Sequence, residues 1–144
     1  MSSEMIAIAA DHAGYDLKCS LKRHLAEQGF SIVDLGTDNT EPVDYPDFAG
    51  VLAQAVSGGR MARGVLLCGS GIGMSIAANR FASVRAALVH DEEAARLARQ
   101  HNDANVLVMG ARRIDSSVAE DCLIAFLTIP FEGGRHQRRV FKLT

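Results

Sequence analysis

Strand-sized apolar runs alternate along this chain with segments in which apolar residues recur every three or four positions. That alternation is typical of a parallel sheet covered by helices on both faces. A chain of 144 residues has the length of one domain. We therefore expect a single domain, 1–144, with an α/β fold: a three-layer, Rossmann-like sandwich around a five-stranded parallel sheet. The strands are expected over residues 5–10, 31–35, 64–68, 84–89 and 105–109.

Caps and helix breakers indicate where the helices begin and end. Leucines recur every four residues over 17–25, and Gly29 is expected to end that helix. Pro46 suits the first turn of a second helix. Asp91 is expected to cap a helix that runs to about residue 101, with two glutamates favourably placed at the positive end of its dipole.

A last long helix is expected to begin near Asp115 and to end before Pro130. Ser117 and Glu120 have the spacing of a capping box, which would fix its start. From about residue 131 the chain continues as a basic, partly helical tail behind a double-glycine hinge.

The charge balance excludes some partners. A net charge of -2 and a pI near 6.2 give no global field that would draw the protein to nucleic acid or to an anionic membrane. The charges are nevertheless uneven: residues 1–50 hold nine acids and three bases, whereas residues 96–144 hold five acids and eight bases. This late excess of positive charge predicts a local anion site.

No apolar run approaches the ~20 residues that cross a bilayer. The first residues lack the basic region and long apolar core of a signal peptide, so a cytoplasmic protein is expected.

The three cysteines are widely spaced, without a C-x-x-C pair, which argues against a disulfide framework and against a zinc site. We expect no bound metal. Cys19 and Cys122 fall inside predicted helices and are expected to be buried apolar residues. Cys68 ends a strand just before a helix, where a thiol pKa can fall and provide a base or nucleophile. The alternative for Cys68 is again a buried apolar residue.

Polar residues that follow strands are the candidates for chemistry, because ligands of open parallel sheets bind beyond the carboxyl ends of the strands. Asp11 and His12 follow the first strand, and Arg112 follows the fifth. An acid beside an imidazole at a strand end is typical of a functional pair. His101 and Asn102 differ, because they close a helix before the fifth strand and should face the opposite edge of the sheet. His24 is expected to be solvated on its helix, and His90 to end a strand.

The segment Gly69-Ser70-Gly71-Ile72-Gly73 is the sharpest local motif. Its glycines let backbone N-H groups approach a phosphate or an oxyanion closely. It is neither a Walker loop nor a complete G-x-G-x-x-G fingerprint, because position 74 is methionine. A nucleotide site with Asp91 as the ribose-binding acid, or a plain strand-to-helix turn, remain as alternatives.

The basic tail has phosphate as its natural partner. Arg135 and Arg139 share one face if the tail is helical, and His136 and Arg138 add to the cationic patch. A solvated tail is the alternative. An RNA-contacting tail is disfavoured, because no aromatic stacking platforms accompany the arginines.

Four motifs together resemble one known family: residues 10–14 (Ala-Asp-His-Ala-Gly), 68–79 (Cys-Gly-Ser-Gly-Ile-Gly-Met-Ser-Ile-Ala-Ala-Asn), 99–107 (Arg-Gln-His-Asn-Asp-Ala-Asn-Val-Leu) and 132–136 (Glu-Gly-Gly-Arg-His). In this order they closely resemble the type B ribose-5-phosphate isomerases, a family that also includes galactose-6-phosphate isomerase subunits. The resemblance covers nearly the whole chain.

The resemblance implies roles for individual residues. It makes Cys68 the base of the isomerisation and Ser70 the group that exchanges protons between the two substrate oxygens, with the amides of loop 69–73 as an oxyanion hole. It makes His101, assisted by Asp11, the residue that opens the sugar ring. The substrate-binding residues that it implies are His12, Gly69, Gly71, Ile72, Gly73, Asn102, Arg112, Arg135 and Arg139.

Two positions qualify this transfer. Some relatives use a glutamate six residues after the cysteine, where this chain has Met74, so it resembles the cysteine-type branch. Arg138 departs from the family pattern, which leaves Arg138 or Arg139 to reach the phosphate, and helical spacing from Arg135 favours Arg139.

The implied activity is a metal-independent, cofactor-free isomerisation of ribose 5-phosphate and ribulose 5-phosphate through a cis-enediol. Allose 6-phosphate, galactose 6-phosphate or a tetrose 4-phosphate are alternative substrates, and a non-catalytic sugar-phosphate binding subunit is a further alternative. A small nucleotide-dependent oxidoreductase is the rival enzyme class. We expect a homodimer, or a dimer of such dimers, in which His101, Asn102 and Arg112 of one subunit reach the Cys68 loop of the other. For Arg112, which follows a strand, a place in the site of its own chain is the alternative.

Overall fold

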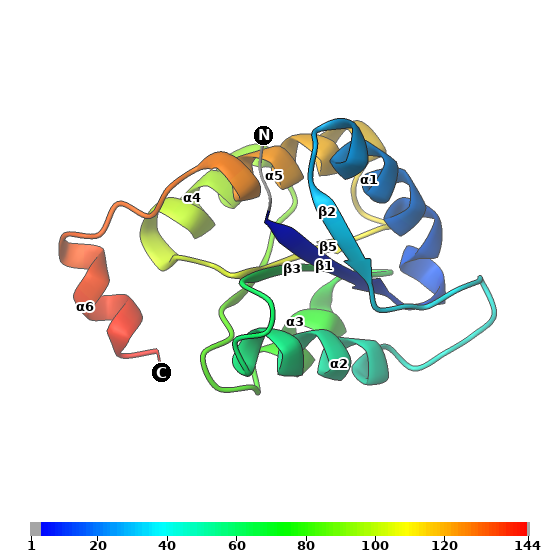
Figure 1. Ribbon diagram of the computed structural model, residues 1–144, viewed down its shortest axis with the longest axis horizontal. Coiled ribbons are helices and arrows are strands. Elements are labelled where there is room, and N and C mark those ends of the chain that lie inside the picture. The colour runs from blue at the N-terminus through cyan, green and yellow to red at the C-terminus, as the bar shows by residue number, and fades with distance from the viewer. Residues whose placement is uncertain (1–3, 144) are drawn as a thin grey trace.

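The computed structural model describes residues 4–143 and has the predicted three layers (Figure 1). The middle layer is a five-stranded parallel sheet in the order β2-β1-β3-β5-β4. Its strands are β1 (Met5–Ala10), β2 (Ser31–Asp34), β3 (Arg63–Cys68), β4 (Ala86–Leu88) and β5 (Val106–Gly110). The expected α/β fold is thereby confirmed.

Helices cover both faces of the sheet (Figure 1). On one face lie α1 (Tyr15–Glu27), α4 (Glu92–Asn102) and α5 (Ser116–Thr128); on the other lie α2 (Tyr45–Ser57) and α3 (Ile72–Ala78). Because side chains alternate along a strand, each central strand serves both cores. In β3, for example, Val65 and Leu67 pack toward α1 and α5, whereas Leu66 and Cys68 pack toward α2 and α3.

The helix signals were mostly correct. Pro46 lies in the first turn of α2, and the Asp91 carboxylate caps α4 by accepting from the Ala94 N-H at 2.8 Å. The expected capping box of α5 was wrong. The N-cap residue is Asp115, so Ser117 lies inside the first turn, and the Asp115 side chain makes no capping hydrogen bond.

The fourth strand is shorter than expected, three residues in place of six. This strand, β4, lies at the edge of the sheet. On its open side the Asn79 side chain accepts from the Ala86 N-H at 2.8 Å and donates to the Ala86 carbonyl at 2.9 Å. A side chain thus supplies the hydrogen bonds that a further strand would have made.

A buried ion pair joins α1 to the end of β2. Lys18 is 1% exposed, and its ammonium donates to both Asp34 carboxylate oxygens, at 2.7 and 2.9 Å, and to the Thr37 carbonyl. Burial alone would raise the pKa of Asp34, but hydrogen bonds from Lys18, Lys22 and the Gly36 N-H outweigh it and lower that pKa. The pair secures the segment that follows β2.

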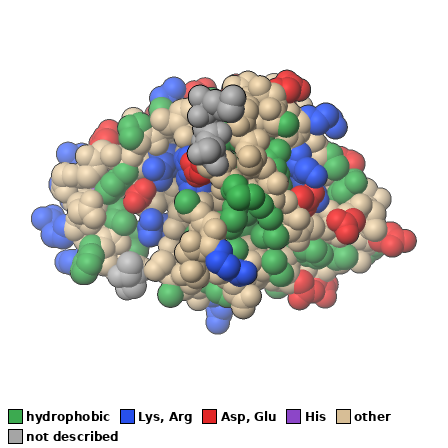
Figure 2. All heavy atoms as spheres, viewed as in Figure 1, with side chains coloured by type: hydrophobic (Ala, Val, Ile, Leu, Met, Phe, Trp, Pro, Cys, Tyr) green, Lys and Arg blue, Asp and Glu red, His purple; other side chains and the backbone are tan. Residues whose placement is uncertain are grey.

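The chain ends in a short helix, α6 (Arg135–Phe141), which contacts α4 and projects from one end of the body (Figure 1). Lys and Arg side chains gather at that end, whereas acidic side chains gather at the opposite end (Figure 2). The charges that are unevenly distributed along the sequence are therefore also unevenly distributed over the surface. No helix among residues 4–143 is long and apolar enough to span a membrane.

Candidate active site

A cavity of about 750 Å³ opens at the carboxyl ends of β1, β3 and β5. The strand order reverses there, since the chain leads from β1 to β2 on one side and then from β2 across β1 to β3 on the other. Its lining consists of Asp11, His12, Ala13, Tyr45, Cys68, Gly69, Ser70, Ile72, Gly73, Ile76, Arg112 and Arg113. The strand-end residues predicted from sequence therefore meet in one place.

Asp11 and His12 are held by backbone amides. One Asp11 oxygen accepts from the N-H groups of Ala13 and Gly14, at 3.0 and 3.1 Å, and the side chain is almost fully buried. The His12 Nδ1 atom accepts from the Val43 N-H at 3.0 Å. The neutral imidazole therefore carries its proton on Nε2, which makes that atom a hydrogen-bond donor.

Cys68 ends β3 as a nearly buried side chain, 4% exposed, at the wall of the cavity. Its sulfur accepts from the Gly71 N-H at 3.2 Å, and the Ser70 hydroxyl accepts from the Ile72 N-H at 3.2 Å. The loop thus directs a backbone amide at the sulfur. An oxyanion bound by the Gly71 and Ile72 amides would have to share them with these two side chains.

Two loop glycines and the glycine that ends β5 are required by close contacts. Gly71 has a φ of +80°, and a Cβ there would lie 2.5 Å from Leu88. A Cβ on Gly73 would lie 2.4 Å from the Tyr45 ring, and one on Gly110 would lie 2.5 Å from the Ser70 carbonyl. Side chains at these positions would displace the loop, so the glycines shape the cavity beside Cys68.

Arg112 lies in the cavity of its own chain. Its backbone N-H donates to the Gly69 carbonyl at 3.0 Å, and a Cβ on Gly69 would lie 3.2 Å from the Arg112 guanidinium. Of the two placements left open for Arg112, the structure shows the one in its own chain's cavity. The cause is local: the turn after β5 is bonded to the end of β3, which keeps this arginine over the loop.

His101 and Asn102 end α4, far from this cavity in the chain's own fold. Cys68 pairs with Gly110 at the carboxyl end of β5, whereas α4 leads into its amino end. Five residues of strand separate the two edges by roughly 16 Å. Asn102 lines a different cavity, together with Arg85. The predicted placement at the opposite edge is thus confirmed.

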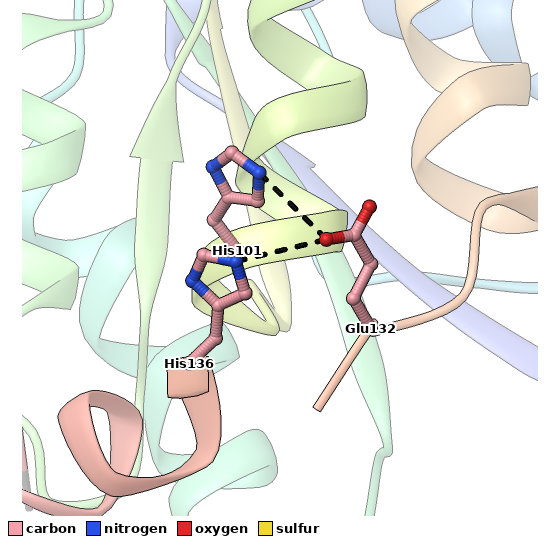
Figure 3. A group of neighbouring side chains, drawn as sticks. All are labelled: His101, Glu132 and His136. Carbon is pink, nitrogen blue, oxygen red and sulfur yellow. Dashed lines mark ion pairs between the residues drawn. The ribbon is translucent and has the colours of Figure 1, made fainter. Parts of the chain in front are cut away.

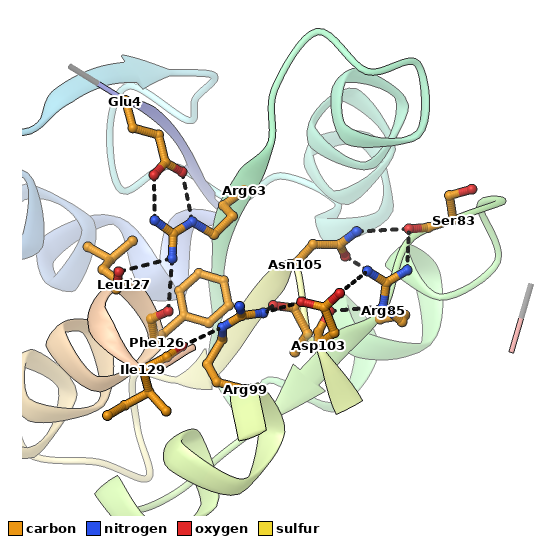
Figure 4. Close-up of polar contacts among 11 residues, drawn as sticks. Glu4, Arg63, Ser83, Arg85, Arg99, Asp103, Asn105, Phe126, Leu127 and Ile129 are labelled. Carbon is orange, nitrogen blue, oxygen red and sulfur yellow. Dashed lines mark hydrogen bonds and ion pairs between the residues drawn. The ribbon is translucent and has the colours of Figure 1, made fainter. Parts of the chain in front are cut away.

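A polar network fixes the end of α4 (Figure 4). Asp103 takes a left-handed conformation, φ 47°, directly after Asn102. The Arg99 guanidinium donates to the Asp103 carboxylate at 2.9 Å and to the Ile129 carbonyl at 3.1 Å, while Arg85 donates to the Asp103 carbonyl at 2.9 Å. Arg99 therefore positions both the end of α4 and the segment that leads into the tail.

Beside this helix end the structure brings together three residues that sequence spacing did not connect (Figure 3). The rings of His101 and His136 stack with centroids 4.2 Å apart. The Glu132 carboxylate lies 3.9 Å from His101 Nε2 and 3.6 Å from His136 Nε2. Burial, then the neighbouring His101 and Arg135, lower the pKa of His136. A fold-dependent juxtaposition of this kind leaves no signal in the sequence.

The tail arginines 135, 138 and 139 are all exposed on α6, away from the Cys68 cavity. The helical tail is confirmed, and Arg135 and Arg139 are one turn apart on it. In a single chain, the candidate residues thus form two groups: a cavity group around Cys68, and an outer group of His101, Asn102, Arg135 and Arg139.

Burial settles the expectations for His24, Cys19 and Cys122, and capping settles the one for Asp91. His24 is not solvated: its side chain is 21% exposed, and Nδ1 lies 4.0 Å from a Glu120 oxygen. Cys122 is buried as expected, whereas Cys19 is only half-buried. Asp91 is engaged as a helix cap, which accounts for it without a nucleotide.

The chain was compared with protein families and with individual known proteins. A family model described as Ribose/Galactose Isomerase matches residues 6–143. The chain belongs to the ribose/galactose isomerase family. The resemblance noted from its four motifs is thereby confirmed. Ribose-5-phosphate isomerase B of Escherichia coli is 45% identical over 139 residues, covering 96% of this chain and 93% of that protein.

Solved structures agree with this membership of the ribose/galactose isomerase family. A ribose 5-phosphate isomerase of Thermotoga maritima has a TM-score of 0.96 and 46% identity, covering 99% of this chain and 98% of that chain. Ribose-5-phosphate isomerase B of Mycoplasma genitalium, solved with bound ribulose-5-phosphate, has a TM-score of 0.95 and 43% identity, covering 99% and 95%. The fold of this chain is that of these enzymes over essentially its whole length.

Proposed function

We propose that this chain is a ribose-5-phosphate isomerase that interconverts ribose 5-phosphate and ribulose 5-phosphate. The observation that carries the proposal is family membership at 45% identity to a ribose-5-phosphate isomerase B, together with a cavity in which Cys68, Ser70 and a glycine loop face His12 and Arg112. Groups suited to proton transfer and groups suited to phosphate binding thus lie together at one edge of the sheet.

In the proposed reaction Cys68 moves the carbon-bound proton. As a thiolate it removes the proton from C2 of the open-chain aldose and returns it to C1 of the enediol, which yields the ketose. The Gly71 N-H, directed at the sulfur at 3.2 Å, holds the Cys68 side chain in place at the loop. Ser70, two residues further in the same loop, passes a proton between O1 and O2, so that the overall charge of the substrate is unchanged.

The phosphate group of the substrate would be bound by donors on both sides of the cavity. His12 offers its Nε2-H because its Nδ1 is already engaged, and Arg112 offers a charged fork of N-H groups. A phosphate does not change during the isomerisation, so these contacts hold the substrate in place.

Ring opening would need the outer group. Ribose 5-phosphate is a closed furanose, and opening it moves a proton from the anomeric hydroxyl to the ring oxygen, the role proposed for His101 with Asp11. Since His101 and Cys68 lie at opposite edges of the sheet in one chain, and these edges are roughly 16 Å apart, a second copy has to supply His101. We therefore propose a two-fold dimer in which His101, Asn102, Arg135 and Arg139 of one subunit complete the Cys68 cavity of the other. The enzyme is expected to act in the cytoplasm.

The experiment is an isomerase assay of the purified protein against ribose 5-phosphate, allose 6-phosphate, galactose 6-phosphate and erythrose 4-phosphate. We expect the highest kcat/KM with ribose 5-phosphate. Faster turnover of another sugar phosphate would mean that this sugar phosphate is the substrate, and the proposed mechanism would still apply. No turnover of any of the four, with tight binding of at least one, would identify a binding subunit instead.

A further inference from the structure

The cluster of His101, Glu132 and His136 is built from three separate parts of the chain. His101 lies at the end of α4, Glu132 in the connection to α6, and His136 in the first turn of α6. The Glu132 N-H donates to the Gln100 carbonyl at 3.0 Å, which ties this connection to the residue before His101. The cluster is therefore fixed by backbone contacts as well as by side-chain contacts.

The three side chains face one another without hydrogen bonding. Glu132 Oε1 lies 3.6 Å from His136 Nε2 and 3.9 Å from His101 Nε2, both beyond hydrogen-bond length. The ligand atoms of all three residues lie within 4.8 Å of one another. Three ligands around one zinc ion, at ~2.0–2.2 Å from it, lie roughly 3.3 Å apart. Bringing these atoms to that separation takes a turn of the His101 ring as well as a closer approach.

His136 supplies an independent indication of a ligand. Its side chain is 9% exposed, and its Nε2 atom is fully buried without a hydrogen-bond partner among the described residues. A buried polar atom without a hydrogen bond costs free energy, and the contact with Glu132 at 3.6 Å is an ion pair only when His136 is protonated. This atom points at the Glu132 carboxylate (Figure 3), so an ion held between them would satisfy it.

We propose that His101, Glu132 and His136 form a binding site for a divalent transition-metal ion, Zn²⁺ being the best match to a two-histidine, one-carboxylate set. Three protein ligands leave a fourth position for water, as in exchangeable zinc sites. The two stacked rings are within 12° of parallel, so their lone pairs do not yet converge. His101, with a side chain that is 39% exposed, has room to turn, whereas the buried His136 stays in place.

Binding there would inhibit the proposed isomerase. A His101 nitrogen bound to metal cannot carry a proton, so ring opening would stop; this consequence rests on the proposed function. Arg135 and Arg139 lie on the same short helix as His136 and repel a cation. We therefore expect an exchangeable regulatory site that is weaker than a closed structural zinc site.

The test is calorimetric titration of tag-free protein with ZnCl₂, with wild type, Glu132→Gln and His136→Ala compared. We expect one site per chain in the wild type and binding weakened by more than about tenfold in each variant, as loss of one of three ligands requires. Glu120→Gln is the matched control, because it alters a histidine-glutamate pair that lacks a second histidine. Cys68→Ala controls for zinc bound by the reactive thiol. Both controls should bind as the wild type does.

Two results would overturn the proposal: no binding to the wild type, or binding that survives Glu132→Gln and His136→Ala but is lost in Cys68→Ala. Circular dichroism verifies that each variant is folded. If His136→Ala is unfolded, zinc binding by Glu132→Gln alone decides whether the proposal holds. In the activity arm, Zn²⁺ should inhibit turnover of ribose 5-phosphate in the wild type and at least about tenfold less well in Glu132→Gln. Equal inhibition of both would refute the His101 mechanism. Because binding is read without turnover, failure of the isomerase assay leaves the metal test intact.

Discussion

The Arg112 guanidinium lies over Gly69, so close that a Cβ on that glycine would come within 3.2 Å of it. The contact joins the turn after β5 to the residue that follows Cys68. Gly69→Ala should therefore push the flexible arginine out of its position while costing less than about 1 kcal/mol of stability. We predict a severalfold rise in KM for ribose 5-phosphate and a smaller change in kcat.

Gly50→Ala is the control for this substitution. Gly50 lies inside α2, and among residues 4–143 a Cβ there would meet Phe81 alone, at 3.9 Å. An alanine should stabilise that helix by about 0.5–1 kcal/mol and leave KM unchanged. If Gly69→Ala also left KM unchanged, Arg112 would not be a phosphate ligand.

Cys68→Ala is expected to abolish isomerisation in a folded protein. The alanine removes the proton carrier, which should lower kcat by at least about 100-fold. It also leaves the Gly71 N-H without its sulfur acceptor, at a cost of about 1 kcal/mol. Steady-state kinetics and thermal unfolding measure the two effects, and activity near that of the wild type would remove Cys68 from the mechanism.

Cys122 gives the matched comparison. It is fully buried in α5, and burial, followed by the charges of Asp91 and Asp121, raises its pKa to about 11. Cys122→Ala should cost about 1–2 kcal/mol of stability without loss of activity. In the native wild type, iodoacetamide should spare Cys122, because its thiol stays protonated at neutral pH.

The tail arginines should act on substrate affinity. Removal of either Arg135 or Arg139 should raise KM for ribose 5-phosphate by about 10- to 100-fold, the cost of losing a charged hydrogen bond to phosphate. Arg138→Ala, which leaves the i, i+4 pair of Arg135 and Arg139 intact on the same face of α6, should raise KM less. An equal effect of all three substitutions would mean that the tail contributes only general positive charge.

The Lys18–Asp34 pair makes stability depend on pH. Since the folded protein lowers the pKa of Asp34, the pair stabilises fully above the ordinary aspartate value of 3.8 and loses its effect as pH falls through the folded value. Asp34→Asn leaves a buried ammonium short of its counter-charge, so we predict a loss of about 3 kcal/mol at pH 7. Urea denaturation should show the difference from wild type narrowing below about pH 4. A constant difference down to pH 3 would contradict the pairing.

Much of the fold and the cavity group could be predicted because their signals are local. A strand's end is visible in the sequence, and parallel strands bring all their carboxyl ends to one edge, so Asp11, Cys68 and the glycine loop had to meet. The position of His101 at the other edge followed from the same rule. The family resemblance added roles, which no spacing could supply.

What escaped prediction depends on contacts between distant segments. Lys18 sits in a leucine-rich helix, and only the fold shows that Asp34 reaches it. Glu132 and His136 join His101 because the tail crosses back over α4. The direction of the Arg112 side chain was decided by the turn after β5, which bonds to the Cys68 strand rather than projecting toward a neighbour.

The central claim is that one active site uses Cys68 of one subunit and His101 of another, and subunit mixing tests it most directly. Cys68→Ala and His101→Ala chains, each inactive alone, are unfolded and refolded together in equal amounts. Random pairing makes half of the dimers mixed, each with one intact and one doubly altered site, so about a quarter of wild-type activity should return. If verified mixed dimers show no recovery, Cys68 and His101 act within the same chain and the shared site is wrong.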